Sequence, residues 1–474
     1  MGRYKELLLN TGLFAISSIS VKFISFVLVP LYTFYLSASE YGITDMSVVV
    51  VSLMTPLCTF SITDAVLRFA IDDKNNSTRY MLIGLQITVL SIVVAGALLP
   101  LLDFSFFGGL GCYKVLFLIN YAVSVFQLYF GTVARIQNQI KLIPISSIIS
   151  ALSNVACSYY FIVFLRMKIY GYFYAMIISG IICVLVYVVK GHYLTLILAK
   201  PSSSDVALLK KMVSFALPLV PNSIFWWIGT SINRFLITSL LGIAASGLFA
   251  AASKIPNLIT TVYQIFQQAW NLSVFQEFRH SGLARFYEIV FKFVLAGLSL
   301  SASLLILIAK PIATVVLQKG FFSSWILMPL LIVAVFFNSL NSFLGTISTA
   351  AMKTKNLFVT TCVGALLNVL ITGLLIPTCG LYAACLGMCV SNFVILCMRF
   401  AISLKIIYFK IPWIRLSVLI MILCLQSFLV ISNGNPVYWL QVCLFVAMAV
   451  LSIGLVFPEV TRFMQKKKAS KVLK

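Results

Sequence analysis

Five ionisable side chains interrupt long apolar runs of this sequence, and their chemistry is the first thing to explain. They are Lys22, Asp64, Arg68, Arg234 and Lys254. A charged side chain at the centre of a bilayer costs about 3 kcal/mol on insertion scales, so such residues usually face a partner, water or the interior of a bundle. Four cations against one anion would make that interior attract anions. We therefore expect Lys22, Arg68, Arg234 and Lys254 to bind an anionic substrate along a cationic cavity.

Lys22 carries the sharpest signal of the five. It lies in "SSISVKFISFVLVP", residues 17–30, twelve residues after Asn10 and fourteen before Leu36. At the rise of an α-helix these separations are about 18 and 21 Å, too far for a lysine side chain to reach either interface. We expect a cation that faces the cavity. An internal structural pair, for instance with Asp64, is the alternative.

The other four residues have both functional and structural interpretations. Lys254 precedes Pro256 by two residues, and a proline there bends the helix, as is common near transport sites. Arg234 is about 9 Å from the outer end of its span, within reach of that interface. Asp64 and Arg68 are spaced for an i, i+4 pair, with Arg68 near the inner boundary. Asp64 is the only acidic residue that we place deep within a span, where it is a salt-bridge partner or an ion-coupling site.

Composition indicates the elements that must position these residues. The chain has 474 residues, of which 61% are hydrophobic and 9% charged, and its mean hydropathy is +1.08. Apolar runs long enough to cross about 30 Å of hydrocarbon recur along its length. We predict an all-α polytopic membrane protein with about fourteen transmembrane helices, since a β-barrel would show short alternating segments. The spans that hold the five charges are 10–36, 42–69, 212–240 and 244–273.

The distribution of positive charge predicts the orientation. With the N-terminus inside, 25 of the 34 Lys and Arg residues fall on the inner side, 5 on the outer side and 4 within spans. Short loops with this asymmetry favour cytoplasmic location of both termini. The net charge of +23 therefore needs no nucleic acid, and the tail "QKKKASKVLK" is expected to lie against anionic lipid headgroups.

An internal repeat predicts the domain organisation. "SASEYGITDMS" from Ser37 aligns with "GIAASGLFAAAS" from Gly242, which places Gly42 over Gly247. A second pair, "YGYFYAMIISGIICVLV" and "CGLYAACLGMCVSNFVI", aligns at a similar offset. Two homologous six-helix lobes, related by an axis along the membrane normal, would then enclose the substrate site. The predicted parts are 1–190 for the N-terminal lobe, 191–211 for a cytoplasmic linker, 212–405 for the C-terminal lobe, 406–457 for two additional helices and 458–474 for the basic tail.

Nothing in the sequence predicts an enzyme, a metal site or a cofactor. The two histidines, His192 and His280, lie in inner loops without a metal-ligand pattern. Eleven scattered cysteines form no disulfide framework, and no Gly-rich phosphate loop follows a strand. Energy for transport would then come from an ion gradient, the membrane potential or the substrate gradient.

Three passages resemble the polysaccharide transporter family, the Wzx type of lipid-linked oligosaccharide flippase in the multidrug/oligosaccharidyl-lipid/polysaccharide (MATE-like) superfamily. They are the opening from "NTGLFAISSISVKF" to "TDMSVVV", the "DAVLRF" of the second span, and "SINRFLITSLLGIAASGLFAAASKIPNLI". The resemblance implies two six-helix lobes and two extra C-terminal helices. It also implies movement of undecaprenyl-diphosphate-linked O-antigen, capsule or exopolysaccharide units from the inner to the outer leaflet of a bacterial cytoplasmic membrane. The partners it implies are that lipid-linked oligosaccharide, membrane lipids and other polysaccharide assembly proteins.

Two other functions remain open at this point. A multidrug exporter of the same fold would need acidic residues for cationic drugs, whereas the predicted cavity has the opposite sign. A polysaccharide polymerase or ligase would need a large outer loop with catalytic residues, and the outer loops predicted here are short.

Overall fold

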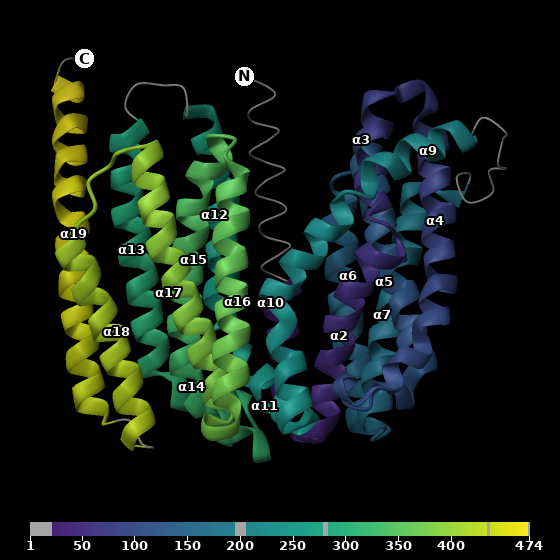
Figure 1. Ribbon diagram of the computed structural model, residues 1–474, viewed down its shortest axis with the longest axis horizontal. Coiled ribbons are helices and arrows are strands. Elements are labelled where there is room, and N and C mark those ends of the chain that lie inside the picture. Colours follow the sequence, from purple (N-terminus) through teal and green to yellow (C-terminus); the bar gives the residue numbers. More distant parts are fainter. Residues whose placement is uncertain (1–20, 195–204, 278–282, 434–436, 473–474) are drawn as a thin grey trace. The chain divides into compact units, whose positions relative to one another are not determined.

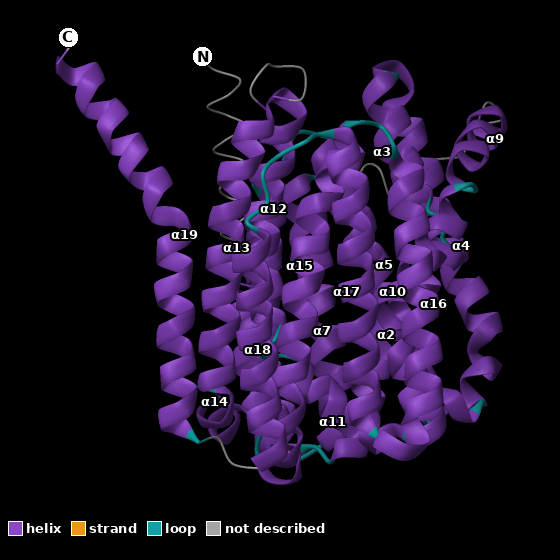
Figure 2. Ribbon diagram, turned by 60° about the vertical axis from the view of Figure 1, so that its left-hand side comes forward, coloured by secondary structure: helices purple, strands orange, loops and turns teal. Residues whose placement is uncertain are grey.

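The structure is a computed structural model that describes residues 21–194, 205–277, 283–433 and 437–472. These residues contain helices and loops but no strand (Figures 1 and 2). The predicted all-α class is therefore confirmed. The chain divides into two compact units, Met1–Ala250 and Ala251–Lys474.

Unit 1 is built from a first helix, Val21–Tyr35, followed by a series of longer ones. These are α2 (Ala38–Cys58), α3 (Ile62–Asp72), α4 (Ser77–Leu98), α5 (Lys114–Ile136), α6 (Leu142–Ser158), α7 (Lys168–Gly191), α9 (Asp205–Ala216), α10 (Leu219–Leu241) and α11 (Ile243–Ser253), which continues past the unit boundary. Within the predicted linker, residues from Asp205 onward are helical, and α9 packs against α3 and α4.

Local sequence explains where α2 begins and ends. Ser37 caps its N-terminus: the Ser37 hydroxyl accepts from the Glu40 N–H at 3.2 Å, and the Glu40 carboxylate accepts from the Ser37 N–H at 2.8 Å. At the other end, Phe60 and Ser61 take left-handed backbone angles, which interrupt the helix. The predicted span 42–69 is consequently two helices, α2 and α3.

Two apolar clusters hold unit 1 together. One gathers Val66, Tyr80, Tyr129 and Tyr187 from α3, α4, α5 and α7, and the Tyr129 hydroxyl donates to the Met81 carbonyl at 2.6 Å. The other gathers buried side chains of α2, α5 and α7, which include Met46, Tyr121 and Phe173. Buried tyrosines of this kind satisfy their hydroxyls within the core, so they add specificity to packing.

The two glycines that the repeat aligns are in contact in unit 1. A Cβ added to Gly42 would collide with the Ile243 carbonyl oxygen and lie 3.1 Å from the Gly247 nitrogen. A Cβ added to Gly247 would collide with the Ala38 carbonyl oxygen and lie 2.8 Å from the Gly42 nitrogen. The contact is reciprocal, because Ala38 and Ile243 are also aligned by the repeat. Such a self-complementary contact is what a two-fold relation between α2 and α11 produces.

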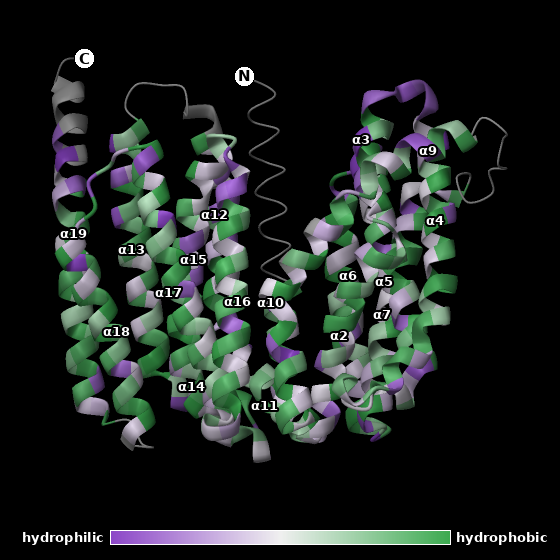
Figure 3. Ribbon diagram, viewed as in Figure 1, coloured by the Kyte–Doolittle hydropathy of each residue, from purple (hydrophilic) through white to green (hydrophobic). Residues whose placement is uncertain are grey.

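Unit 2 contains the remaining helices. They are α12 (Asn257–Glu277), α13 (Leu283–Leu307), α14 (Ala309–Val316), α15 (Met328–Ala350), α16 (Thr354–Cys379), α17 (Leu381–Ile406), α18 (Trp413–Asn433) and α19 (Tyr438–Val472). Helix α15 is its centre, since most of its residues are buried. Phe336, Leu340, Phe343 and Leu344 are among the residues it buries. Most helices are hydrophobic over much of their length, while hydrophilic residues gather around α3 and on the part of α19 that precedes its grey tip (Figure 3).

Eleven helices of the described residues are long and apolar enough to cross a membrane, and a twelfth counts if the bent pair Val206–Phe225 and Trp227–Leu241 is one span. The predicted total of fourteen stays a prediction. Residues 10–20 of the predicted first span lie outside the described residues. The predicted eighth span is divided at Lys254–Pro256 into α11 and α12.

Candidate functional site

Lys22 lies at the start of the described part of the first helix. Its side chain is exposed, as is that of its neighbour Phe23. The preceding part of the predicted span lies outside the described residues. Lys22 is thus not enclosed by the helix packing of unit 1, and its predicted role as a substrate cation stays a prediction.

Asp64 and Arg68 both lie on α3, but Arg68 pairs with Asp72 instead of Asp64. The Arg68 Nη2 lies 3.1 Å from Oδ2 of Asp72, one turn further along, and not beside Asp64. The side chains of Arg68 and Asp72 are 63% and 49% exposed, so this ion pair contributes little to stability. Asp64 is itself exposed. The break at Phe60–Ser61 makes α3 a separate helix, and the predicted depth of Asp64 within a span stays a prediction.

Arg234 is the predicted cation that the structure places in a buried contact. Its Nε lies 3.3 Å from Oδ2 of Asp45 on α2, and the two side chains are 16% and 12% exposed. Its guanidinium carbon also lies 5.0 Å from the ring centroid of Phe249 on α11. One arginine therefore connects α2, α10 and α11. Its charge is largely balanced inside the protein.

Asp45 is a buried acid that sequence reasoning missed. The predicted span began at residue 42, which placed Asp45 at the membrane surface, whereas the helix begins four residues earlier at Ala38. A signal was available: Asp45 and Arg234 both lie near the outer ends of their predicted spans, and oppositely charged residues at one depth are candidates for a pair. When Asp45 is counted together with the five predicted charges, the excess of cations over anions in the predicted cavity is smaller than four against one.

Lys254 lies in the turn between α11 and α12, as the position of Pro256 predicted. Its N–H bonds the Ala251 carbonyl at 3.2 Å, and its side chain is half-buried. It belongs to unit 2, whereas Lys22, Asp64, Arg68 and Arg234 belong to unit 1. The contact between Arg234 and Asp45 brings a predicted site residue against an opposite charge within a helix interface.

Unit 2 contains an ion network that the sequence reading did not anticipate. Arg285 lies 2.7 Å from Glu288 and 2.6 Å from Glu459, and Lys292 lies 2.8 Å from each of the same two carboxylates. Glu288 and Glu459 are 10% and 6% exposed. Two cations and two anions thus form a closed ring that joins α13 to α19. This ring attaches the last helix to unit 2.

Replacing Glu459 with alanine is expected to destabilise unit 2, because Lys292, whose side chain is 16% exposed, would lose one of its two carboxylate partners. Removing one member of a buried ion pair typically costs about 3–5 kcal/mol. The measurement is the midpoint of thermal unfolding of the purified protein in nanodiscs. Arg462→Ala is the matched control, since Arg462 is 64% exposed and lies 3.7 Å from Glu459. Equal midpoints for the two variants would contradict the structural role of the ring.

Arg399 on α17 is a further partly buried cation. Its guanidinium donates to the Asn341 carbonyl at 2.7 Å and to the Thr360 and Thr361 hydroxyls at 3.3 and 3.2 Å. These neutral acceptors lie on α15 and α16. Arg399 therefore joins three helices of unit 2.

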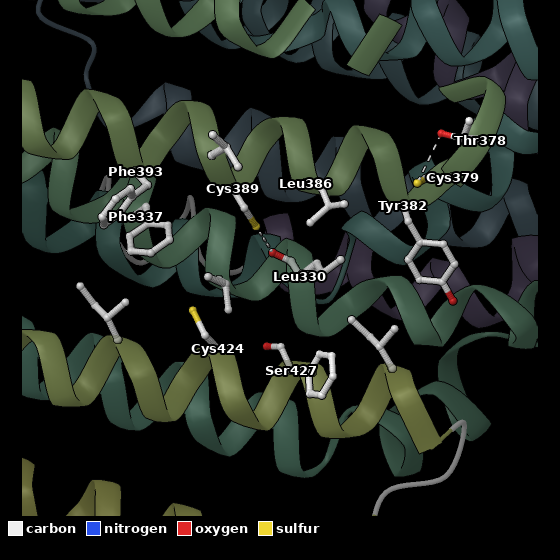
Figure 4. A pocket seen from close by; sticks show the side chains of 15 residues that line it. Leu330, Phe337, Thr378, Cys379, Tyr382, Leu386, Cys389, Phe393, Cys424 and Ser427 are labelled. Carbon is white, nitrogen blue, oxygen red and sulfur yellow. Dashed lines mark hydrogen bonds between the residues drawn. The ribbon is translucent and has the colours of Figure 1, made fainter. Parts of the chain in front are cut away.

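A cavity of about 830 Å³ lies between α15, α17 and α18 (Figure 4). Leu386, Phe393, Leu330 and Phe337 point into it, and the Cys389 thiol donates to the Leu330 carbonyl at 3.0 Å. Its lining is almost entirely apolar. Such a cavity accommodates a hydrocarbon chain and offers no charge to an anion. The described residues contain no cluster of His, Cys, Asp and Glu that could hold a metal ion.

Comparison with known proteins gives a family match and a fold match. Residues 7–271 match the family model described as "Polysaccharide biosynthesis protein". No curated protein sequence matches the chain.

Several solved structures share the fold. The lipid II flippase MurJ in an inward closed conformation has a TM-score of 0.68 at 14% identity, covering 96% of this chain and 100% of its own. An inward-facing multidrug resistance transporter of the MATE family has a TM-score of 0.64 at 15% identity, over 85% and 98%. A MOP superfamily transporter from Pyrococcus furiosus, whose title describes a binding pocket of reverse polarity, has a TM-score of 0.59 at 15% identity, over 86% and 96%. At these identities the likeness concerns the fold alone.

Proposed function

Because this chain belongs to the polysaccharide biosynthesis protein family, we propose that it is a flippase for lipid-linked oligosaccharides. In this proposal it moves undecaprenyl-diphosphate-linked repeat units from the inner to the outer leaflet of a bacterial cytoplasmic membrane, by alternating access. Both chain ends lie in the cytoplasm. The observation that carries the proposal is the match of that family over residues 7–271 in a chain with a transporter fold.

The cations have the role of binding the diphosphate. Ammonium and guanidinium groups form short, charge-assisted hydrogen bonds to phosphate oxygens. Lys22 and Arg68 are exposed, so a phosphate can approach both without breaking helix packing. Lys254 sits at the break between α11 and α12, and its side chain is half-buried. Arg234 is the weakest candidate, because its side chain is only 16% exposed where it contacts Asp45.

Lys22→Ala is expected to abolish export while the protein stays in the membrane at a normal level. Lipid-linked repeat units should accumulate in the inner leaflet and surface polysaccharide should be lost, because one phosphate contact is missing. Lys22→Arg should retain most export, since it keeps the charge. Mass spectrometry of extracted lipids measures the lipid-linked repeat units, and labelling of intact cells measures the surface polysaccharide. Lys353→Ala, at an exposed lysine next to α16, is the control.

Normal surface polysaccharide in the Lys22→Ala strain would argue against the cationic mechanism. A deletion strain tested in parallel separates the remaining functions. Changed drug resistance with normal lipid-linked intermediates would favour a multidrug exporter. In vitro polymerisation by the purified chain would favour a polymerase or ligase.

A further inference from the structure

Amide and hydroxyl side chains collect where α12 and α15 pack in unit 2. The Gln267 Nε2 donates to Asn271 Oδ1 at 2.8 Å, to the Thr346 hydroxyl at 3.0 Å and to the Ser342 carbonyl at 3.4 Å. The Thr346 hydroxyl lies 3.1 Å from the same Asn271 oxygen. Around this contact lie further uncharged polar residues. The set, called here the amide face, is Gln264, Gln267, Gln268 and Asn271 on α12 and Asn338, Ser342 and Thr346 on α15.

The amide face has more hydrogen-bonding capacity than its own contacts use. The Oε1 of Gln267 is buried and accepts no hydrogen bond among the described residues. Gln268 and Asn338 are exposed, and their side-chain amides have no hydrogen bond within the part of the chain that the structure describes. Polar residues that serve only to join helices are normally buried and satisfied. The amide face, in contrast, is partly exposed, and some of its donors and acceptors make no hydrogen bond to the described residues.

The exposed amides lie where a lipid-facing surface would be apolar. Asn338 is near the middle of α15, where Figure 3 shows hydrophilic positions, and Gln268 is just past the middle of α12. An amide that faces hydrocarbon without a partner costs several kcal/mol. The exposed row of α16 has the opposite character, since it consists of Leu366, Leu370 and Leu374. We conclude that the amide face borders water or a polar ligand.

We propose that the amide face binds the saccharide part of the substrate; the inference rests on the flippase function proposed above. Each amide offers both a donor and an acceptor, and hydroxyl groups of a sugar need both at once. No member of the face is charged, so it suits neutral hydroxyl and acetamido groups, while the cations described above take the diphosphate. The face would therefore determine which repeat unit is accepted.

The test compares two lipids that bind the full chain in nanodiscs. One is undecaprenyl diphosphate, and the other is the same lipid with its repeat unit, extracted from cells that lack this protein. Native mass spectrometry gives both dissociation constants. In the unchanged protein the saccharide should tighten binding about tenfold, equivalent to about 1.4 kcal/mol. The double variant Gln268→Leu/Asn338→Leu should lose this advantage and bind undecaprenyl diphosphate as before.

Gln318→Leu is the matched control, because it makes the same change at a glutamine that donates to the Thr314 and Val315 carbonyls of its own helix turn. If the double variant is not recovered, Asn338→Ala is measured in its place. A double variant that keeps the full advantage overturns the saccharide assignment, as does a protein that binds both lipids equally. A protein that binds neither lipid overturns the flippase function, and this inference with it.

Discussion

A leucine in place of Gly42 is expected to remove most of the folded protein from the membrane. The added Cβ would collide with the Ile243 carbonyl oxygen, which is backbone and cannot move aside as a side-chain tip can. Forcing atoms into a packed interface costs about 1–3 kcal/mol in ordinary cores, and more where two backbones touch. Gly247→Leu should have the same effect, since it meets the Ala38 carbonyl. The amount of monodisperse protein after detergent extraction measures the effect of each of these two substitutions.

Gly96→Leu is the control for this change. The nearest atom to an added Cβ there is Leu118 Cδ2 at 3.8 Å, which is an ordinary contact. Its yield should therefore stay close to that of the unchanged protein. A normal yield of Gly42→Leu would mean that α2 and α11 do not cross at these glycines.

The second large effect is expected at Asp45. In Asp45→Ala the guanidinium of Arg234 remains largely buried beside Phe249 without its anion, and such a loss costs about 3–5 kcal/mol. Arg234→Ala should cost a similar amount, because the largely buried Asp45 carboxylate would lose the guanidinium beside it. The double variant Asp45→Leu/Arg234→Leu should recover much of the stability, since an apolar pair replaces both charges. Urea or thermal unfolding in nanodiscs provides the comparison.

The double variant Asp45→Leu/Arg234→Leu also tests whether Arg234 binds the substrate. If it regains stability and still exports polysaccharide, Arg234 serves the structure and not the substrate. If it regains stability and exports none, the arginine acts on the substrate as well. Should the double variant be as unstable as the two single losses added together, the ion pair contributes nothing and the structural account of Arg234 is wrong.

Contacts between helices were the part of the site that the sequence could not predict. The sequence shows that Arg234 and Lys22 lie within apolar runs, but hydropathy measures one helix at a time. Whether a charge is balanced depends on which side chain a second helix brings beside it. Asp45 lies 189 positions from Arg234 in the chain, and no local pattern links them. The ring of Arg285, Glu288, Lys292 and Glu459 depends in the same way on α13 and α19 packing together.

The sequence by itself determined the all-α membrane class and the helix break before Pro256. These follow from composition and local backbone preference, which act over a few residues and leave a regular trace in the chain. Only the tertiary structure decided that Arg234 has Asp45 beside it and that Glu459 joins Arg285 and Lys292. Those contacts depend on side chains from helices that are distant in the chain, and they exist only after the helices pack.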